Sequence, residues 1–157
     1  MELSDTQRVL SFESFFAATE KGLRYALVAL FGAEDGRDAS AHALLFGWEN
    51  WDRLQETTNP AGYLYRVGQT WGRRNGRRSE TFPVVSEHRE PWVEPRLPEA
   101  LGALPEHQRV AVVLRHGADW SYDRIAEFMD SSPTSVRKNV ERGLTRLRVA
   151  LEVSYES

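Results

Sequence analysis

Residues 97–148 decide the fold, and they read LPEALGALPEHQRVAVVLRHGADWSYDRIAEFMDSSPTSVRKNVERGLTRLR. Ser121 is a typical N-cap, Asp130-Ser131 turns the chain, and Ser132-Pro133 starts the next helix. The last helix has an apolar residue at every third or fourth position, which buries one face and leaves a polar, basic face outside. These apolar positions are Val136, Val140, Leu144, Leu147 and Leu151. The pattern predicts a helix-turn-helix whose last helix reads the DNA major groove.

The first 78 residues predict a small helical domain of their own. Ser4 and Gln7 fit a capping box, and apolar residues then recur at helical spacing until Gly32, a plausible helix end. A second helix is expected over about residues 35–52, followed by a polar loop. Asn59-Pro60 pairs an N-cap with proline at the first helical position, so a third helix follows. Three such helices can bury a common core.

The segment 79–96, SETFPVVSEHREPWVEPR, has three prolines and no helical periodicity. Proline stops helices and stiffens a chain, so we expect a flexible linker here, with an ordered surface loop as the alternative. The sequence thus predicts an all-α protein with two small domains, residues 1–78 and 97–157, joined by residues 79–96.

Net positive charge is concentrated in two short segments, although the whole chain has a net charge of −3. Residues 66–78 contain five arginines and no acid, and residues 132–148 contain five basic residues and one acid, Glu141. Each segment alone could be a solvated helix face. Two of them, one within a helix-turn-helix, favour local contact with DNA phosphates.

Other classes of function find little support in the sequence. The chain has no cysteine, so thiolate metal sites and disulfides are excluded. His107 and His116 are nine residues apart, which does not place them on one helical turn as a zinc motif would. No glycine-rich phosphate loop or nucleophile elbow occurs. We therefore predict no enzyme activity, no cofactor, no metal and no small-molecule substrate.

No apolar run approaches the ~20 residues that span a bilayer. The N-terminus lacks the basic flank and apolar core of a secretory signal. These features predict a cytoplasmic protein without a membrane segment.

The motifs of residues 97–148 resemble region 4 of the extracytoplasmic-function (ECF) sigma factors, the sigma-70 family subunits that direct bacterial RNA polymerase to promoters. The leucine-proline opening, the Ser-Tyr-x-x-Ile-Ala helix and the Arg-x-x-Leu-x-x-Leu-Arg ending are similar to that family. Matching positions are Leu104, Pro105, Arg109, Leu114, Ser121, Tyr122, Ile125, Ala126, Ser132, Val136, Arg142, Leu147 and Arg148.

The first domain resembles region 2 of the same family, which forms a three- to four-helix bundle. DASAHALLFGWENW, residues 38–51, resembles the segment that docks on polymerase, and NPAGYLYRVGQTWGRRNGRR, residues 59–78, resembles the helix that opens the downstream promoter element. Four positions depart from the family pattern. Ala41 and His42 replace a usual glutamine and acid, Thr70 replaces asparagine, and Arg74 replaces aspartate.

The resemblance implies three sets of contact residues. Upstream (−35) DNA would be read by Thr134, Ser135, Arg137, Lys138, Glu141 and Arg142. Downstream (−10) DNA would be contacted by Asn59, Tyr63, Arg66, Thr70, Arg73, Arg74, Arg77 and Arg78. Polymerase would be bound by Asp38, Ala41, His42, Leu44, Trp48 and Trp51. In the family the loop corresponding to residues 54–59 captures a flipped base, and Tyr63, Tyr65 and Trp71 could stack on unpaired bases or pack in the core.

The implied function is promoter recognition and transcription initiation with bacterial core RNA polymerase and promoter DNA as partners; an anti-sigma factor is left open as a further partner. Two alternatives remain at this stage. One is a stand-alone helix-turn-helix factor, which should dimerise on a palindrome. The other is a sigma-like regulator that binds polymerase without melting DNA, and the four departures keep it open.

Overall fold

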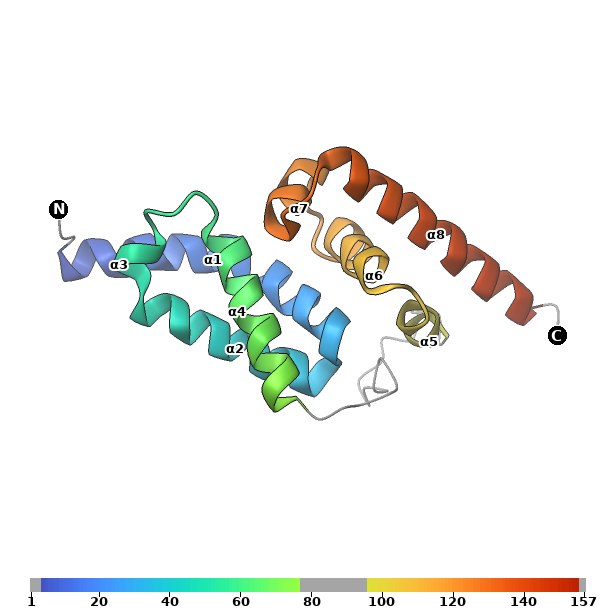
Figure 1. Ribbon diagram of the computed structural model, residues 1–157, viewed down its shortest axis with the longest axis horizontal. Helices are drawn as coiled ribbons and strands as arrows, with labels where there is room; N and C mark the ends of the chain where they lie inside the picture. The colour runs from blue at the N-terminus through green and yellow to red at the C-terminus, as the bar shows by residue number, and fades with distance from the viewer. Residues whose placement is uncertain (1–3, 77–95, 156–157) are drawn as a thin grey trace.

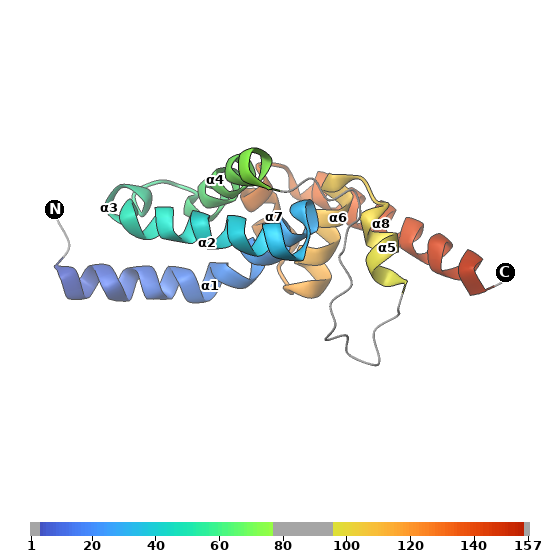
Figure 2. The ribbon, with the colours of Figure 1, turned by 90° about the horizontal axis from the view of Figure 1, so that it is seen from below.

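The computed structural model describes residues 4–76 and 96–155. Within these ranges the regular elements are helices, as the all-α prediction requires. Figure 1 shows helices α1–α4 grouped on one side and α5–α8 on the other. The N-terminal end of α1 and the C-terminal end of α8 lie at opposite ends of the molecule in both views (Figures 1 and 2).

The first group of helices, the N-terminal unit, consists of α1 (Asp5–Phe31), α2 (Ala33–Glu49), α3 (Trp51–Leu54) and α4 (Pro60–Asn75). The predicted capping box is present, because the Gln7 N–H donates to Ser4 Oγ and the Ser4 N–H donates to Gln7 Oε1, both at 3.2 Å. Gly32 ends α1 with a φ of 91°, which glycine adopts without strain. The caps that the sequence predicts at both ends of α1 are therefore confirmed.

The second helix ends earlier than the sequence predicts. We expected it to run to about residue 52, but α2 ends at Glu49 and the short α3 follows. The break lies at Asn50, whose backbone leaves helical geometry (φ −117°, ψ 19°) and whose side-chain Nδ2 donates to the Phe46 carbonyl at 2.9 Å. An asparagine that bonds the backbone in this way competes with the helical hydrogen-bond pattern. The segment expected as loop therefore begins with a helical turn.

The C-terminal unit consists of α5 (Leu97–Gly102), α6 (Glu106–Val112), a π-helical turn η1 (Val113–Gly117), α7 (Tyr122–Met129) and α8 (Pro133–Tyr155). The Arg124 N–H donates to Ser121 Oγ at 3.1 Å, which confirms the predicted N-cap of α7. Asp130 has the left-handed backbone (φ 54°) that turns the chain sharply between α7 and α8. The helix-turn-helix is therefore present at the predicted position.

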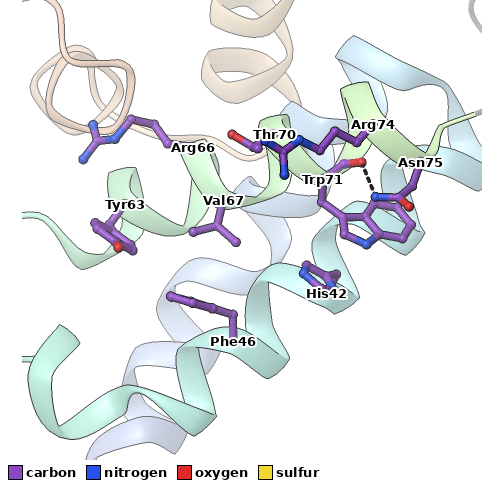
Figure 3. Close-up of a pocket in the computed structure, with 9 residues that line it drawn as sticks. All are labelled: His42, Phe46, Tyr63, Arg66, Val67, Thr70, Trp71, Arg74 and Asn75. Carbon is purple, nitrogen blue, oxygen red and sulfur yellow. Dashed lines mark hydrogen bonds between the residues drawn. The ribbon is translucent and has the colours of Figure 1, made fainter.

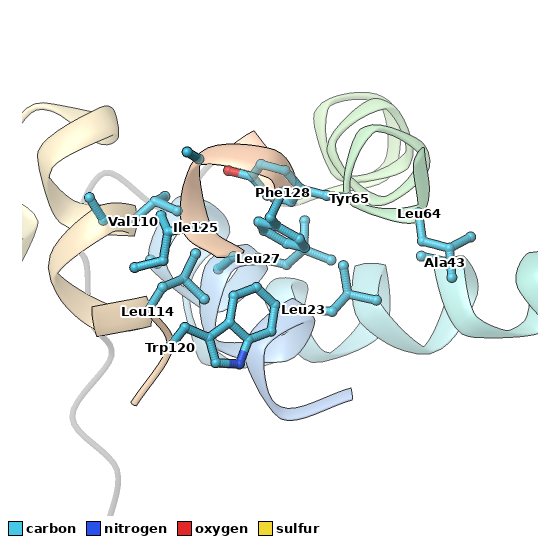
Figure 4. Packing of buried hydrophobic residues seen from close by; sticks show 14 of the residues in the cluster. Leu23, Leu27, Ala43, Leu64, Tyr65, Val110, Leu114, Trp120, Ile125 and Phe128 are labelled. Carbon is cyan, nitrogen blue, oxygen red and sulfur yellow. The ribbon is translucent and has the colours of Figure 1, made fainter. Parts of the chain in front are cut away.

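The two units share one hydrophobic core. In Figure 4, Leu23 and Leu27 of α1 lie beside Trp120, Ile125 and Phe128 of the C-terminal unit. These five side chains are almost completely buried, and they belong to a single cluster of contacting residues. The sequence predicted two small domains and left open whether they pack together.

A shared core predicts that both units unfold together. Leu27→Ala should lower the free energy of unfolding by about 2–5 kcal/mol, because a fully buried leucine leaves a cavity. The decrease in the free energy of unfolding should be the same whether unfolding by urea is followed with a probe in the N-terminal unit or with one in the C-terminal unit. Leu10→Ala is the control, since Leu10 is 58% exposed and should change stability little. Two separate transitions, with only one shifted, would contradict the shared core.

Candidate nucleic-acid interface

The outer face of α8 presents the predicted upstream set to solvent. Thr134, Ser135, Arg137, Lys138, Glu141 and Arg142 are all exposed. The opposite face is anchored, since Val136 and Val140 are 1% exposed and Leu147 is 7% exposed. Gly143 lets α8 approach α6 closely, because a Cβ there would lie 2.7 Å from Cγ2 of Val112. A rigidly seated helix with an exposed basic face has the form that major-groove reading needs.

The start of α8 is held by local contacts. Ser132 Oγ accepts from the Ser135 N–H at 3.1 Å and also bonds Ser135 Oγ at 3.0 Å. The guanidinium of Arg137 lies 5.1 Å from the ring centre of Tyr122, which Arg115 also approaches at 4.6 Å. The cationic end of Arg137 is therefore held at the junction of the two helices of the motif.

A second polar surface lies between α4 and α2. It is a groove of about 510 Å³ lined by His42, Phe46, Tyr63, Arg66, Val67, Thr70, Trp71, Arg74 and Asn75. Figure 3 shows these side chains, with His42 and Phe46 on α2 and the others on α4. Three of the four positions that depart from the family pattern, His42, Thr70 and Arg74, line this one groove.

Two aromatic pairs form the walls of the groove. Phe46 and Tyr63 are stacked with ring centres 6.0 Å apart, and His42 and Trp71 are stacked at 5.3 Å. Arg66 lies 5.9 Å from the Tyr63 ring centre, and Tyr63 itself is 40% exposed. Flat aromatic faces beside arginines suit unpaired bases and their phosphates.

The cations on these surfaces have no acidic partner within the described residues. The two ion pairs found there join Arg8 to Asp52 and Arg24 to Glu20. The charges facing outward on α4 and α8 therefore remain available for phosphate. They belong to Arg66, Arg73, Arg74, Arg137, Lys138 and Arg142, whereas Arg77 and Arg78 lie outside the described residues.

The N-terminal end of α4 is covered by the C-terminal unit. Asn59 caps α4 by accepting from the Gly62 N–H at 3.0 Å, and its Nδ2 donates to the Glu127 carbonyl at 2.7 Å. Tyr65 is 6% exposed and stacks on Phe128 with ring centres 4.5 Å apart. Of the three aromatic residues considered for base stacking, Tyr65 is therefore in the core, Trp71 is half-buried and Tyr63 is accessible.

The expected polymerase set divides into an exposed and a buried part. Asp38, Ala41 and His42 are exposed on α2, and Leu44 and Trp48 are half-buried. Trp51 is 3% exposed, packs on Phe12 and Phe15, and donates from its indole Nε1 to Ser11 Oγ at 3.2 Å. Its role in this arrangement is core packing. The exposed Leu45, at 55%, adjoins this surface and was not among the expected residues.

Sequence reasoning also missed the residues that join the units. Arg109, noted only as a family position, donates to the carbonyls of Ala29, Leu101, Gly102 and Leu104. Burial lowers its pKa, an effect that the charge of Glu106 opposes. Arg109 directly precedes the apolar run of residues 110–114, which was the one available sign of such a role.

Comparison with known proteins agrees with this geometry. Residues 95–147 match the family model described as sigma-70, region 4. This part of the chain is similar in sequence to sigma-70 region 4. In fold, the chain is similar to the sigma factor RpoE of Bartonella quintana, solved in complex with the anti-sigma factor NepR. The two share 19% sequence identity and a TM-score of 0.68 over 91% of this chain and 98% of that chain. No curated protein sequence matches the chain.

These two findings confirm the predicted resemblance to ECF sigma factors of the sigma-70 family. Region 4 is recognised from its sequence, and the shared fold extends over the N-terminal unit as well. Among residues 4–76 and 96–155, no helix is long and apolar enough to cross a bilayer. The same residues contain no cluster of three potential metal ligands.

The buried Tyr65 predicts a specific alkaline sensitivity. Desolvation raises the pKa of Tyr65 above its ordinary value, and the negative charge of Glu106 adds to the shift. The folded protein therefore holds this proton more tightly than the unfolded chain, so stability should fall as pH rises above about 10. Tyr65→Phe should reduce that fall in denaturation curves measured at increasing alkaline pH. Tyr63→Phe, at an exposed site, should not.

Proposed function

We propose that this chain is an ECF-type sigma factor that directs core RNA polymerase to promoters and initiates transcription. In this proposal residues 1–78 act as region 2, residues 79–96 as linker and residues 97–157 as region 4. The observation that carries it is the exposed basic face of α8 within a matched region 4. The cationic, aromatic groove on the other unit supplies a second contact of the right chemistry.

At the upstream element, α8 would lie in the major groove of duplex DNA. Arg137, Lys138 and Arg142 can donate to guanine edges or phosphates, while Glu141 can accept from cytosine. The helix N-terminus at Thr134 and Ser135 can hold a phosphate through backbone N–H groups. Phosphate contacts fix the register and base contacts choose the sequence.

At the downstream element, the α4 groove would receive separated strands. Unpairing costs about 1.4 kcal/mol per stacked step. Stacking on an aromatic side chain returns about 1–3 kcal/mol per base, so Tyr63 and the half-buried Trp71 can offset that cost. Arg66, Arg73 and Arg74 would neutralise phosphates beside the opened segment.

Polymerase would bind the exposed face of α2. Asp38, Ala41 and His42 lie on that face, and the neighbouring Leu45 gives it an apolar centre. An anti-sigma factor is a plausible second protein partner, given the complex in which the RpoE structure was solved. Such a protein would act in the cytoplasm, where the polymerase is.

The first test is co-purification with bacterial core RNA polymerase, followed by run-off transcription from fragments that the assembled enzyme selects. We expect a stoichiometric complex and discrete transcripts. Polymerase binding without transcription would favour a sigma-like regulator that melts no DNA. A polymerase-free dimer on a palindrome would favour a stand-alone transcription factor.

Arg137→Ala with Lys138→Ala should abolish binding to the upstream element without unfolding the protein. Both side chains are exposed, so their loss removes DNA contacts and little packing. The assay is fluorescence anisotropy on the selected duplex at several salt concentrations, and each lost phosphate contact lowers the salt slope by about 1. Arg146→Ala with Arg148→Ala is the matched control on the same helix. Equal affinity of the two double variants would refute the assignment.

Arg66→Ala with Arg74→Ala should reduce promoter opening while upstream binding persists. These arginines flank the groove and have no described acidic partner, so removing them weakens the hold on separated strands. Permanganate reactivity of unpaired thymines measures opening directly. Arg37→Ala, an exposed arginine on α2 outside the DNA set, should leave it unchanged.

A further inference from the structure

An apolar cavity of about 490 Å³ lies apart from the residues proposed to contact DNA or polymerase, none of which lines it. It is bounded by α1 and the start of α2 on one side and by α5, η1 and α8 on the other. Its walls are mainly apolar side chains, among them Val28, Ala29, Leu101, Val113, Leu144 and Leu147. Sites for small molecules are mostly apolar and have volumes of about 300–1,000 Å³. This cavity therefore has the size and lining of a ligand site.

The walls of the apolar cavity are held in place by the surrounding structure. Helix α5 packs on α8, and η1 packs on α1. A single guanidinium joins walls from the two units, because Arg109 donates to the Leu101 carbonyl at 3.0 Å and to the Ala29 carbonyl at 2.6 Å. Ala29 is 1% exposed and Leu147 is 7% exposed, so both are fixed by packing as well. The cavity is preformed, as sites for small molecules usually are.

The π-helical turn η1 forms one wall of the apolar cavity. The Ala118 N–H donates to the Val113 carbonyl at 3.1 Å, five residues back, where an α-helix would bond four residues back. Val113, His116 and Gly117 of this turn line the cavity. A Cβ on Gly117 would lie 3.1 Å from the Tyr25 ring, so glycine lets the turn approach α1 closely. Turns of this kind are rare and are frequently found at functional sites.

The charged side chains that line the apolar cavity are all basic. They are Arg24, Arg37 and His116, and no carboxylate is among the lining residues. Arg24 is paired with Glu20 at 2.8 Å. Arg37 and His116 are exposed, which places them at the mouth, and neither forms an ion pair with another described residue. An apolar interior with a basic mouth complements a molecule that has an apolar body and an anionic head.

We propose that the apolar cavity binds a small anionic amphiphile, an unbranched acyl chain that ends in a carboxylate. The chain would lie against the apolar walls, and the carboxylate would lie at the mouth. There Arg37 can donate two parallel hydrogen bonds to it, the strongest arrangement for this pair of groups. The ligand would be bound without chemical change. The site needs neither DNA nor polymerase, so the inference goes beyond the proposed function and does not rest on it.

The two parts of the ligand make separate predictions. The apolar walls predict that affinity rises with chain length, by about three- to fourfold for each methylene group removed from water, until the cavity is filled. The basic mouth predicts that the acid binds about tenfold or more tightly than the alcohol of equal length, because only the acid offers a charged acceptor. A site that was only apolar would show the first dependence without the second.

The first test is isothermal titration calorimetry of the full chain with hexanoate, octanoate and decanoate, each below the concentration at which it forms micelles. We expect saturable one-to-one binding that tightens by about tenfold for each pair of methylene groups. Decanol should bind more weakly than decanoate, and decyltrimethylammonium should bind more weakly still. The absence of saturable binding by decanoate would overturn the proposal. Equal affinity for the acid, the alcohol and the cation would overturn it as well.

Arg37→Glu tests the seat of the carboxylate. Arg37 is exposed, so the substitution reverses the charge at the mouth with little change in packing. Decanoate should bind about tenfold or more weakly to this variant, and decanol should bind as before. Arg53→Glu is the matched control, since Arg53 is an exposed arginine of the same unit that does not line the apolar cavity. Equal affinity of the two variants for decanoate would contradict the assignment of the mouth.

Val113→Phe tests the position of the chain. Val113 is a half-buried wall residue, and a larger side chain there takes up the space that the ligand needs. This variant should lose binding of both decanoate and decanol. Val149→Phe is the matched control, because Val149 is 54% exposed on α8 and does not line the apolar cavity. Unchanged binding by a folded Val113→Phe variant would overturn the proposal.

Circular dichroism and a cooperative urea transition establish whether Val113→Phe is folded, and if it is not, the Arg37→Glu comparison decides. These measurements use the free chain, so their failure leaves the proposed role in transcription untouched. Conversely, a chain that binds decanoate as described but does not associate with polymerase would refute the proposed function alone.

Discussion

The fit of Trp120 against Gly22 is the constraint on which the arrangement of this chain depends. One residue without a side chain lets an indole from the other half of the sequence reach the backbone of α1. Phe128, Tyr65 and Arg124 then pack around that indole, and the separate hydrophobic surfaces merge into one core. Dense packing of this kind tolerates little change in volume. The relative position of the two units follows from it.

The two candidate DNA surfaces remain outside this core and differ in chemistry. The α8 surface is a single helix face of hydroxyl and cationic donors with one carboxylate acceptor, Glu141, suited to base edges in a duplex. The α4 surface is a groove with aromatic walls and arginines, suited to bases that have left the duplex. Promoter opening requires one surface that binds duplex DNA and another that holds the separated strands. The covered end of α4 is the one place where the core and the second surface compete.

Local features of the fold could be predicted because their causes are local. Ser4, Asn59 and Ser121 act as caps in the structure as the sequence indicates, and the spacing of Val136, Val140 and Leu147 orients α8 correctly. The early end of α2 was not predicted, because it depends on the backbone conformation and the side-chain hydrogen bond of one residue, Asn50. The contact between units could not be found, since neither Gly22 nor Trp120 carries a periodic pattern. Likewise, burial of Tyr65 and Trp51 depends on partners far away in sequence, so their accessibility was not predictable.

The most direct measurement of the central claim is a footprint of the polymerase assembled with this chain on a selected promoter. DNase protection and permanganate reactivity should be mapped on the same fragment. If α8 binds duplex DNA upstream and the α4 groove holds separated strands downstream, two separated segments of the promoter should be protected. Reactive thymines should be confined to the downstream segment. A single short protected segment without reactive thymines, the same with and without polymerase, would contradict the account.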